Sequence, residues 1–456
     1  MNYDVIVLGG GPGGYLAAER AAQAGLKTAC IEDLHLGGTC LNEGCIPTKT
    51  LLNSGKLFTH AKNSASYGVH AENVTIDHNA VIDRKEQVIK TLVGGVAATL
   101  KACKVDVISA RGIITGRTAE GTTVEADGKA YTAKNLIIAT GSSCAVPPIA
   151  GLKEGLTSGF VLTNKEMLNL RELPRKLVVL GGGVIGLEMA TYYAMAGVDT
   201  TVIEMLDHIG GPIDADMVKI LQKNCEAEGM HFLLQSRVSG IQDNTVIYEK
   251  DGKVCKIETD KVLLSIGRRP NGDTFGAENI GLMMDRGAVV SDEHMRTNIP
   301  GVYAVGDVNG KAMLAHTAYR EAEVAVNHIL GKRDRMRYNA IPSVLYTVPE
   351  LSAVGETEAS AKAKGMDVKV VKLPMVYSGR YVAENQGGDG ICKVVFDKAT
   401  DTIVGAQALA NYSSEFIVSV ATFMEMEMTA DDIKEIVFPH PTVSEILREA
   451  VCQYKK

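Results

Sequence analysis

A strand–turn–helix–strand pattern near the start of the chain constrains its fold more than any other feature. The apolar run at residues 3–8 leads into the glycine-rich turn at 9–14, which opens a helix-like stretch. A second apolar run at 28–31 ends at Glu32, 23 residues after Gly9. In a nucleotide-binding unit such glycines let the backbone approach a pyrophosphate, and the acid accepts hydrogen bonds from a ribose. One copy alone is weak evidence, because glycine-rich turns are common.

The pattern occurs a second time in the middle of the chain. Residues 177–180 lead into the turn at 181–186, and the strand-like run after the next helix ends at Glu204. Glu204 again lies 23 residues after the first glycine, Gly181. Two copies with equal spacing are much harder to obtain by chance than one. The repeat therefore predicts an α/β protein with two Rossmann-like dinucleotide-binding domains.

The rest of the chain predicts its domain organisation. A chain of 456 residues is long enough for about three domains. Residues 80–101 are expected to form a helix, and residues 112–133 a meander of strands. Beyond residue 340, strands alternate with two or three expected helices and no glycine fingerprint occurs, which indicates a separate α+β domain. The expected domains are residues 1–147, 148–272, 273–340 and 341–456.

Charge and composition exclude several classes of function. The 47 basic and 54 acidic residues give a net charge of −7, which argues against nucleic acid as a partner. No apolar run approaches the roughly 20 residues that a membrane span needs, and we expect no export signal because no basic leader precedes the first strand. Seven of the nine cysteines are scattered without pattern, as is typical of a reducing compartment, so we expect a cytoplasmic protein of bacterial type.

Cys40 and Cys45 are the two cysteines that do form a pattern, because glycines surround them and Pro47 follows. Residues five apart on an ideal helix point about 140° away from each other, so a disulfide between them requires an irregular turn. The flanking glycines permit such a turn, and Pro47 suits the first turn of a following helix. The spacing fits structural zinc poorly. It leaves a redox-active pair and two buried free thiols equally open.

Taken together, these motifs resemble those of the flavin disulfide reductases (class I pyridine nucleotide-disulfide oxidoreductases), and within them the dihydrolipoyl dehydrogenases. The resemblance covers essentially the whole chain. It lies in GGGPGG at 9–14, GGTCLNEGCIPTK at 37–49, ATG at 139–141, GGGVIGLE at 181–188, SIGRRPN at 265–271, GVYAVGDV at 301–308 and HPTVSE at 440–445. It implies, in chain order, an FAD-binding domain, an NAD-binding domain, a central domain that completes the FAD site and a C-terminal dimerisation domain.

The resemblance also implies which residues bind the two cofactors. For FAD they are Gly9, Gly11, Gly14, Glu32, Gly38, Thr39, Lys49, Thr140, Gly141, Asp307 and Ala315. For NAD they are Gly181, Gly183, Gly186, Glu204 and Gly267. Glu204 also favours NAD over NADP on local grounds, because a carboxylate would repel a 2′-phosphate and no arginine follows in residues 205–207.

Four residues receive roles in electron transfer from the same resemblance. Cys40 is implied to be the interchange thiol that forms a mixed disulfide with the substrate, and Cys45 the thiol beside the flavin. Lys49 is implied to lie near flavin N5, with Glu188 as its ion-pair partner. Without the resemblance, this lysine and this glutamate would be read as solvated helix charges.

His440 lies between Pro439 and Pro441, which predicts extended or turn backbone at this position. The residues alone favour a loop histidine without a role. The resemblance implies a general base oriented by Glu445 that acts across the interface of a homodimer. Many family members carry a second histidine where this chain has Phe438, a difference that concerns substrate binding or pH dependence rather than the base itself.

These features predict a homodimeric enzyme that oxidises protein-bound dihydrolipoyl groups and reduces NAD. Its partner would be the lipoyl-bearing protein of a 2-oxoacid dehydrogenase or glycine cleavage complex. Glutathione reductase-like enzymes usually use NADP, and mercuric reductase-like enzymes carry a vicinal cysteine pair where this chain has only Cys452. A non-catalytic flavoprotein scaffold would be expected to have lost a thiol, the base or the acid, whereas this chain keeps all of them.

Overall fold

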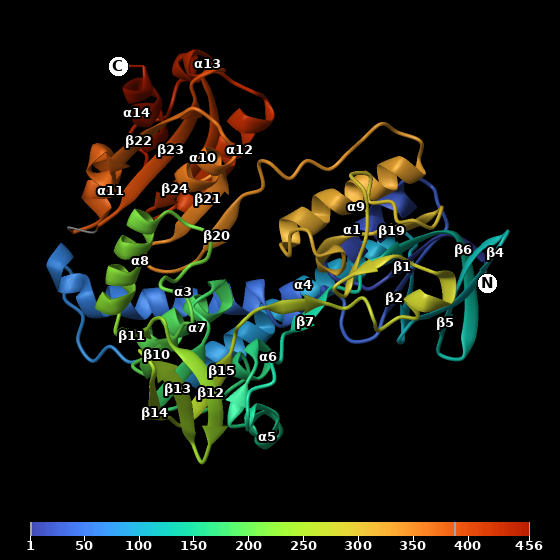
Figure 1. Ribbon diagram of the computed structural model, residues 1–456, viewed down its shortest axis with the longest axis horizontal. Helices are drawn as coiled ribbons and strands as arrows, with labels where there is room; N and C mark the ends of the chain where they lie inside the picture. Colours follow the sequence, from blue (N-terminus) through green and yellow to red (C-terminus); the bar gives the residue numbers. More distant parts are fainter. Residues whose placement is uncertain (1, 387–388, 456) are drawn as a thin grey trace.

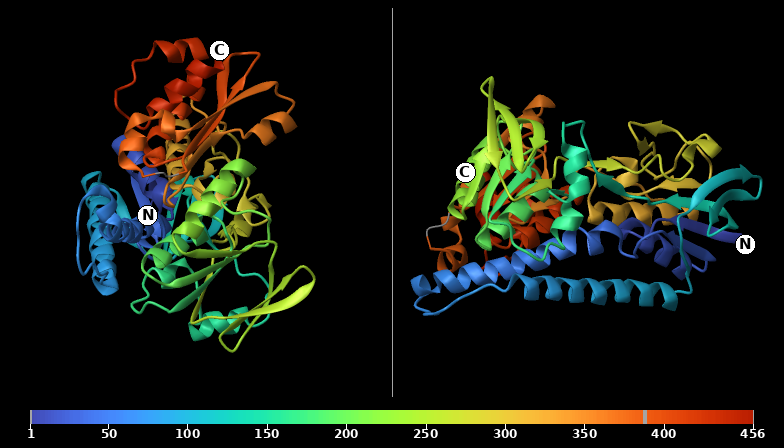
Figure 2. Two further views of the ribbon diagram at one scale, coloured as in Figure 1. Left: turned by 90° about the vertical axis from the view of Figure 1, so that its left-hand side faces the viewer. Right: turned by 90° about the horizontal axis from the view of Figure 1, so that it is seen from below.

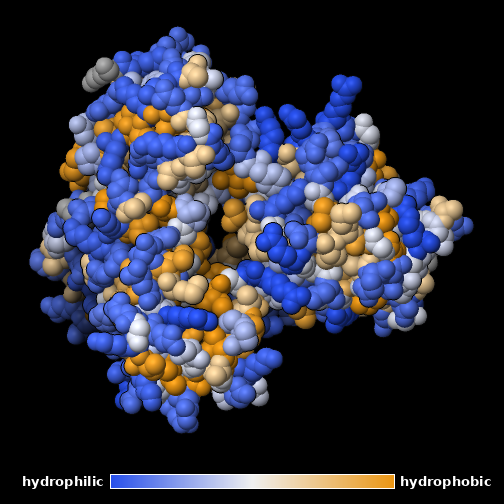
Figure 3. All heavy atoms as spheres, viewed as in Figure 1, coloured by the Kyte–Doolittle hydropathy of each residue, from blue (hydrophilic) through white to orange (hydrophobic). Residues whose placement is uncertain are grey.

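The computed structural model describes residues 2–386 and 389–455, which form three lobes (Figure 1). The space-filling view shows a hollow between the first lobe and the other two (Figure 3). No helix in the described part of the chain is both long and apolar enough to cross a membrane.

The first lobe is built on a seven-stranded sheet in the order β3-β2-β1-β6-β5-β4, with β19 also paired to β6. Its strands are β1 (Asn2–Leu8), β2 (Thr28–Glu32), β3 (Asp106–Ser109), β4 (Ile113–Thr118), β5 (Gly121–Ala126), β6 (Lys129–Ile138) and β19 (Val302–Ala304). Strand β1 is parallel to β2 and β6 and is almost continuously buried, as expected for a parallel strand covered on both faces. Helices α1 (Pro12–Gln23) and α9 (Ala315–Ile329) lie side by side on this sheet (Figure 1).

The second lobe repeats this design with a five-stranded parallel sheet in the order β11-β10-β9-β15-β8. Its strands are β8 (Val161–Leu162), β9 (Lys176–Leu180), β10 (Asp199–Ile203), β11 (Met230–Leu233) and β15 (Lys261–Leu264). The lobe also contains α5 (Leu152–Ser158), α6 (Asn164–Met167), α7 (Val184–Met195), α8 (Ala215–Ala227) and the meander β12 (Arg237–Gln242), β13 (Thr245–Lys250) and β14 (Lys253–Glu258). The prediction of two Rossmann-like units is confirmed.

The third lobe is an antiparallel sheet in the order β20-β21-β24-β23-β22 with helices against it, so the prediction of a C-terminal α+β unit is also confirmed. Its strands are β20 (Ser343–Leu345), β21 (Leu351–Gly355), β22 (Val368–Pro374), β23 (Ile391–Asp397) and β24 (Thr402–Leu409). Its helices are α10 (Glu358–Ala363), α11 (Gly379–Glu384), α12 (Ser413–Glu425), α13 (Ala430–Glu435) and α14 (Glu445–Tyr454). The prediction of two or three helices was too low. Three of the five described helices have only six residues each, too few for a helical period to be recognised.

A pair of long helices connects the three lobes. Helices α3 (Cys45–Asn63) and α4 (His78–Ala102) run side by side along one face of the molecule (Figure 2), and the short α2 (Gly38–Asn42) precedes α3. Helix α3 packs closely on α7, because a Cβ atom at Gly55 would come within 2.8 Å of Met195 Cε. Smaller elements are β7 (Ser142–Cys144), β16 (Arg268–Pro270), β17 (Met284–Asp285), β18 (Ala288–Val289) and the 3₁₀ turns η1 (Ser64–Tyr67), η2 (Ala277–Ile280), η3 (Gly306–Asn309) and η4 (Met375–Tyr377).

Candidate functional site

The first glycine-rich turn brings the N-terminus of α1 close to the sheet and leaves it open on the other side. A Cβ atom at Gly14 would come within 1.9 Å of Gly9 O, and one at Gly9, where φ is +106°, within 2.3 Å of Ala139 O. Gly11 caps α1, and a Cβ atom there would have only Gly38 Cα within 4 Å, at 3.8 Å, among the described atoms. The exposed N–H groups of this helix end can therefore bind a pyrophosphate.

The second turn has the same construction at the start of α7. A Cβ atom at Gly186 would come within 2.1 Å of Gly181 O, and one at Gly181 within 2.7 Å of Ser265 O. Among the described residues, no atom beyond the chain neighbours lies within 4 Å of the Cβ position of Gly183, the N-cap of α7, nor of that of Gly267. A second phosphate-binding helix end is thus open.

The two fingerprint acids make matching hydrogen bonds. Glu32 Oε2 accepts from Gly10 N–H at 2.6 Å, and its Oε1 accepts from Leu34 N–H at 2.8 Å. Glu204 Oε2 accepts from Gly182 N–H at 2.7 Å, and its Oε1 accepts from Leu206 N–H at 2.8 Å. Burial raises the pKa of Glu32, although these backbone hydrogen bonds act in the opposite direction. Each carboxylate keeps lone pairs with which it can accept from ribose hydroxyls.

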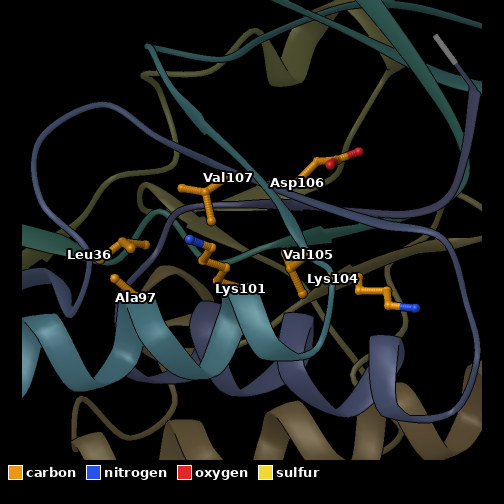
Figure 4. A pocket seen from close by; sticks show the side chains of 7 residues that line it. All are labelled: Leu36, Ala97, Lys101, Lys104, Val105, Asp106 and Val107. Atoms are coloured by element: carbon orange, nitrogen blue, oxygen red, sulfur yellow. The ribbon is translucent and has the colours of Figure 1, made fainter.

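A cavity of about 370 Å³ adjoins the first fingerprint at the edge strand β3 (Figure 4). Its lining residues are Leu36, Ala97, Lys101, Lys104, Val105, Asp106 and Val107. Leu36 also lies against the turn, because its Cδ2 is 3.0 Å from the Cβ position of Gly10. Four of the seven lining residues are apolar and three are charged, a combination that can accept a flat ring system with polar edges.

The two cysteines lie on either side of a break between helices. Cys40 is on α2 and Cys45 is the first residue of α3, so the predicted irregular turn is present, and Pro47 lies in the first turn of α3 as expected. Gly37 and Gly38 before the pair have φ values of +90° and +54°, which favour glycine. Thr39 lies on α2 next to Cys40.

Both cysteines are free thiols, and the Cys40 thiol donates a hydrogen bond to the Cys45 sulfur. This hydrogen bond lowers the pKa of Cys45 and raises that of Cys40. Partial desolvation of the sulfur by the surrounding protein raises the pKa of Cys45. The positive charge of Lys49 lowers this pKa, and the negative charge of Glu188 raises it. Cys45 is therefore the thiol that ionises first, as a reactive thiolate requires.

Lys49 and Glu188 form an ion pair between α3 and α7. Lys49 Nζ is 2.7 Å from Glu188 Oε2, and the glutamate is 3% exposed, so the expected pairing is present and neither charge is simply solvated. Glu188 Oε1 accepts from Tyr346 N–H at 3.1 Å. The Lys49 ammonium also lies 4.4 Å from the centroid of the Tyr346 ring. Sequence reasoning missed Tyr346, which follows β20.

Asp307, on η3, meets the turn after β6. Ser142 Oγ donates to Asp307 Oδ2 at 2.5 Å. Arg268 Nε donates to Ser142 Oγ at 2.7 Å and lies 3.9 Å from Asp307 Oδ2. Asn271 binds the same turn, donating from Nδ2 to Thr140 O and from its backbone N–H to Gly141 O, each at 3.0 Å. Arg268 lies inside the motif at 265–271 and Ser142 directly follows the one at 139–141, but no local pattern indicated that they meet.

Glu321, on α9, holds the turn that carries Asp307. It is 0% exposed and accepts from Gly306 N–H at 2.6 Å, Asn309 Nδ2 at 2.9 Å and Tyr338 Oη at 2.6 Å. Ala315 is the first residue of this helix. Ala318, one turn later, lies against Gly13 and Gly306, so the start of α9 adjoins both the first fingerprint and the Asp307 turn.

His440 lies in non-helical backbone, as its flanking prolines predict. Its Nδ1 is 2.9 Å from Glu445 Oε1, and Glu445 Oε2 accepts from Thr442 N–H at 2.8 Å. The histidine side chain is 78% exposed. Within residues 2–386 and 389–455, no hydrogen bond or ion pair joins His440 to Cys40 or Cys45. Phe438 packs against the core of the third lobe.

Comparisons with known proteins identify the family. The model of the pyridine nucleotide-disulphide oxidoreductases matches residues 3–322, and that of their dimerisation domain matches residues 341–451. The chain belongs to the pyridine nucleotide-disulphide oxidoreductase family. It is an oxidoreductase with the flavoprotein disulfide reductase fold.

Named members of the family match over the full length. The chain is 39% identical to dihydrolipoyl dehydrogenase of Bacillus subtilis, covering 99% of this chain and 96% of that one. It is 37% identical to mitochondrial dihydrolipoyl dehydrogenase of Bos taurus, covering 99% and 90%. Among solved structures, LpdA of Mycobacterium tuberculosis has a TM-score of 0.89 at 26% identity, and the HOCl-induced flavoprotein disulfide reductase RclA of Escherichia coli 0.87 at 28%, each covering 99% of both chains.

Pyridine nucleotide-disulphide oxidoreductases of this kind use FAD and NAD(H), which are therefore the cofactors of this chain. The residues present fit both groups. Each glycine turn leaves a helix end open, and each acid is fixed beside it. Cys45 is exposed at the start of α3, so a flat ring can pack against its sulfur.

Proposed function

We propose that this enzyme oxidises protein-bound dihydrolipoyl groups to lipoyl groups and reduces NAD⁺ to NADH and a proton. The observation that carries the proposal is the placement of Cys40 on α2 and of Cys45 at the start of α3, one turn before Lys49, whose charge helps to lower the pKa of Cys45. The full-length similarity to enzymes named dihydrolipoyl dehydrogenase supports dihydrolipoyl groups as the substrate rather than other thiols such as glutathione.

The two cysteines divide the chemistry between them. In the oxidised enzyme a substrate thiolate attacks Cys40 Sγ, the Cys40–Cys45 bond breaks and Cys45 leaves as a thiolate stabilised by Lys49. The second substrate thiolate then displaces Cys40 and closes the lipoyl disulfide. FAD held beside Cys45 would supply a two-electron acceptor for the dithiol, and NAD⁺ held at the second fingerprint would supply the final hydride acceptor. His440, oriented by Glu445, accepts the substrate proton.

Asp307 and the first fingerprint would hold FAD, and Glu204 with the second fingerprint would hold NAD. In this assignment Gly9, Gly11, Gly14, Gly38 and the helix end of α1 bind the pyrophosphate of FAD. The remaining FAD contacts are assigned to Thr39, Thr140, Gly141 and Ala315. Glu204 distinguishes NAD from NADP, because a fixed carboxylate at the ribose would repel a 2′-phosphate.

A direct test compares substrates and one cysteine variant. We expect turnover with dihydrolipoamide and NAD⁺ to exceed that with NADP⁺ or with glutathione as the thiol. Cys45→Ser should abolish dithiol-linked turnover and keep bound FAD, whereas Cys452→Ser, the matched control, should keep both. Normal lipoamide turnover by Cys45→Ser would overturn the proposal.

We propose that the active unit is a homodimer in which His440 serves the dithiol of the other subunit. The match to the dimerisation domain and the high exposure of this histidine support the arrangement. So do exposed apolar side chains on the same lobe, of which Val437 is 92% exposed and Val376 64% exposed.

Subunit complementation tests the shared site. His440→Ala and Cys45→Ser homodimers should each be inactive with dithiol. When the two are dissociated and mixed in equal amounts, about one quarter of the wild-type activity should return, because random pairing restores one intact site in half of the dimers. If no activity returns from mixed dimers verified by mass, the base acts within its own subunit.

Partner, compartment and domain boundaries complete the proposal. The lipoyl group would be carried by a protein of a 2-oxoacid dehydrogenase or glycine cleavage complex, and the seven cysteines scattered without pattern support the cytoplasm. We divide the chain at residues 147, 272 and 340. The pairing of β19 with β6 supports a role of the segment 273–340 in completing the FAD domain.

A further inference from the structure

Tyr346 contacts both members of the Lys49–Glu188 ion pair. Its backbone N–H donates to Glu188 Oε1 at 3.1 Å, and its ring faces the Lys49 ammonium, 4.4 Å from the ring centroid. The three residues come from three separate elements: α3, α7 and the segment after β20. Tyr346 therefore restrains the ion pair from a third segment, outside the two helices that carry Lys49 and Glu188.

The positions of the Lys49 and Glu188 charges affect the pKa of Cys45. Lys49 lies four residues after Cys45 on α3 and lowers its pKa, whereas Glu188 raises it. The two charges therefore oppose each other at the sulfur, and a small shift of either changes the balance. The lysine side chain is 31% exposed, so the protein must hold it in place against competing water.

We propose that Tyr346 is a positioning residue of the dithiol site, which holds Lys49 through its ring and Glu188 through its backbone N–H so that the Cys45 thiolate is stabilised. The inference rests on the proposed electron transfer through Cys45. The ring contact is a cation–π interaction, which restricts a flexible lysine without a competing negative charge.

The two contacts can be separated by mutation. Tyr346→Leu removes the ring and keeps the backbone N–H, so Glu188 keeps its backbone partner and Lys49 keeps its ion pair but loses the ring contact. The charged and titratable groups that face the two side chains are Cys40, Lys49, Glu188 and Tyr319 at Cys45, and Glu350, Glu188 and Glu415 at Tyr346. All of them remain in the variant.

The readout is the long-wavelength charge-transfer absorption between the Cys45 thiolate and flavin in the reduced holoenzyme, titrated with pH. In Tyr346→Leu its midpoint should rise by at most about 1.5 pH units, because the full energy of one cation–π contact is the upper limit of what the thiolate can lose. Tyr346→Phe keeps the ring and should match wild type. Fluorinated phenylalanines at position 346 keep the shape of the ring and weaken its quadrupole, so they should raise the midpoint in graded steps between wild type and Tyr346→Leu. This series keeps the test available if Tyr346→Leu does not fold.

Two controls distinguish positioning from general damage. Phe58→Leu removes another ring–lysine contact on the same helix, with Lys62 at 5.2 Å, and should leave the midpoint unchanged. In a Lys49→Met background, Tyr346→Leu should add no further shift. A Tyr346→Leu midpoint equal to wild type, a fluorinated series without a trend, or a shift that persists without Lys49 would each overturn the inference. Absence of the absorption from dithiol-treated wild type would instead overturn the proposed function.

Discussion

Glu321 offers a test of how the protein prepares its FAD site before the cofactor binds. The carboxylate is fully buried and accepts hydrogen bonds from Gly306 N–H, Asn309 Nδ2 and Tyr338 Oη. Gly306 has a φ of +73° and directly precedes Asp307, so the carboxylate fixes the turn from which Asp307 would bind the cofactor. Glu321→Ala removes this acceptor and leaves the donors of the turn unpaired inside the protein.

The size of the effect follows from the cost of an unpaired donor. One buried donor without an acceptor costs about 1–3 kcal/mol. If the empty turn avoids this cost by rearranging, FAD must restore the turn when it binds, and its dissociation constant should rise by about 5- to 150-fold. Glu321→Gln should cost much less, because its amide oxygen can accept from the backbone while its NH₂ group donates to the Tyr338 oxygen.

The assay is titration of the FAD-free protein with FAD, followed by flavin fluorescence. Glu323→Ala is the matched control, because Glu323 lies on the same helix, is 40% exposed and forms its ion pairs in the described part of the chain with Arg20 and Arg320. We expect its FAD affinity to remain close to wild type. Wild-type FAD affinity in a folded Glu321→Ala protein would refute the reasoning, as would equal losses in Glu321→Ala and Glu323→Ala.

Three further predictions follow from the charged groups. Because the pKa of Cys45 is lowered, its thiolate should persist at pH values below the usual thiol pKa and become protonated only as the pH falls through the lowered pKa. Lys49→Met should move this protonation to higher pH, as measured by charge-transfer absorption. Glu204→Ala should raise the KM for NAD⁺ by about 10- to 100-fold and reduce discrimination against NADP⁺, measured by steady-state kinetics with both nucleotides. Lys393 is 6% exposed and pairs with Asp214 at 2.9 Å, so Lys393→Met should lower the free energy of unfolding by about 3–5 kcal/mol. Lys398→Met, which breaks an exposed pair with Asp367, should lower it by about 0–1 kcal/mol. Denaturant unfolding measures both.

The parts of the fold that could be predicted are those that local chemistry specifies. Both glycine turns, their flanking strands and the acids after them follow from spacing and backbone freedom within about thirty residues. The break between Cys40 and Cys45 followed from helix geometry and the surrounding glycines. The His440–Glu445 contact spans five residues and is local as well, but only the resemblance predicted it, because the residues alone favoured a loop histidine without a role.

The missed residues depend on packing between distant segments. Tyr346 and Glu188 are separated by 158 positions, and Arg268 and Ser142 by 126. Neither pair follows a periodicity, because each forms only after whole lobes have packed together. The resemblance predicted the Lys49–Glu188 pair, but no motif indicated the aromatic ring beside it.

A shared core explains how a site built from such distant segments can be well defined. The largest apolar cluster includes Leu51 of α3, Leu187 of α7, Leu345 of β20 and Leu409 of β24. Those elements carry Lys49, Glu188 and the segment with Tyr346, so the packing that joins the lobes also sets the distances within the ion pair. When packing fixes the elements that carry a side chain, little additional free energy is needed to bring that side chain into a reactive geometry. For this reason we expect substitutions that loosen this cluster to change the pKa of Cys45 even where the substituted residue does not contact the cysteine. Equivalent substitutions in the separate core of the third lobe should leave this pKa unchanged.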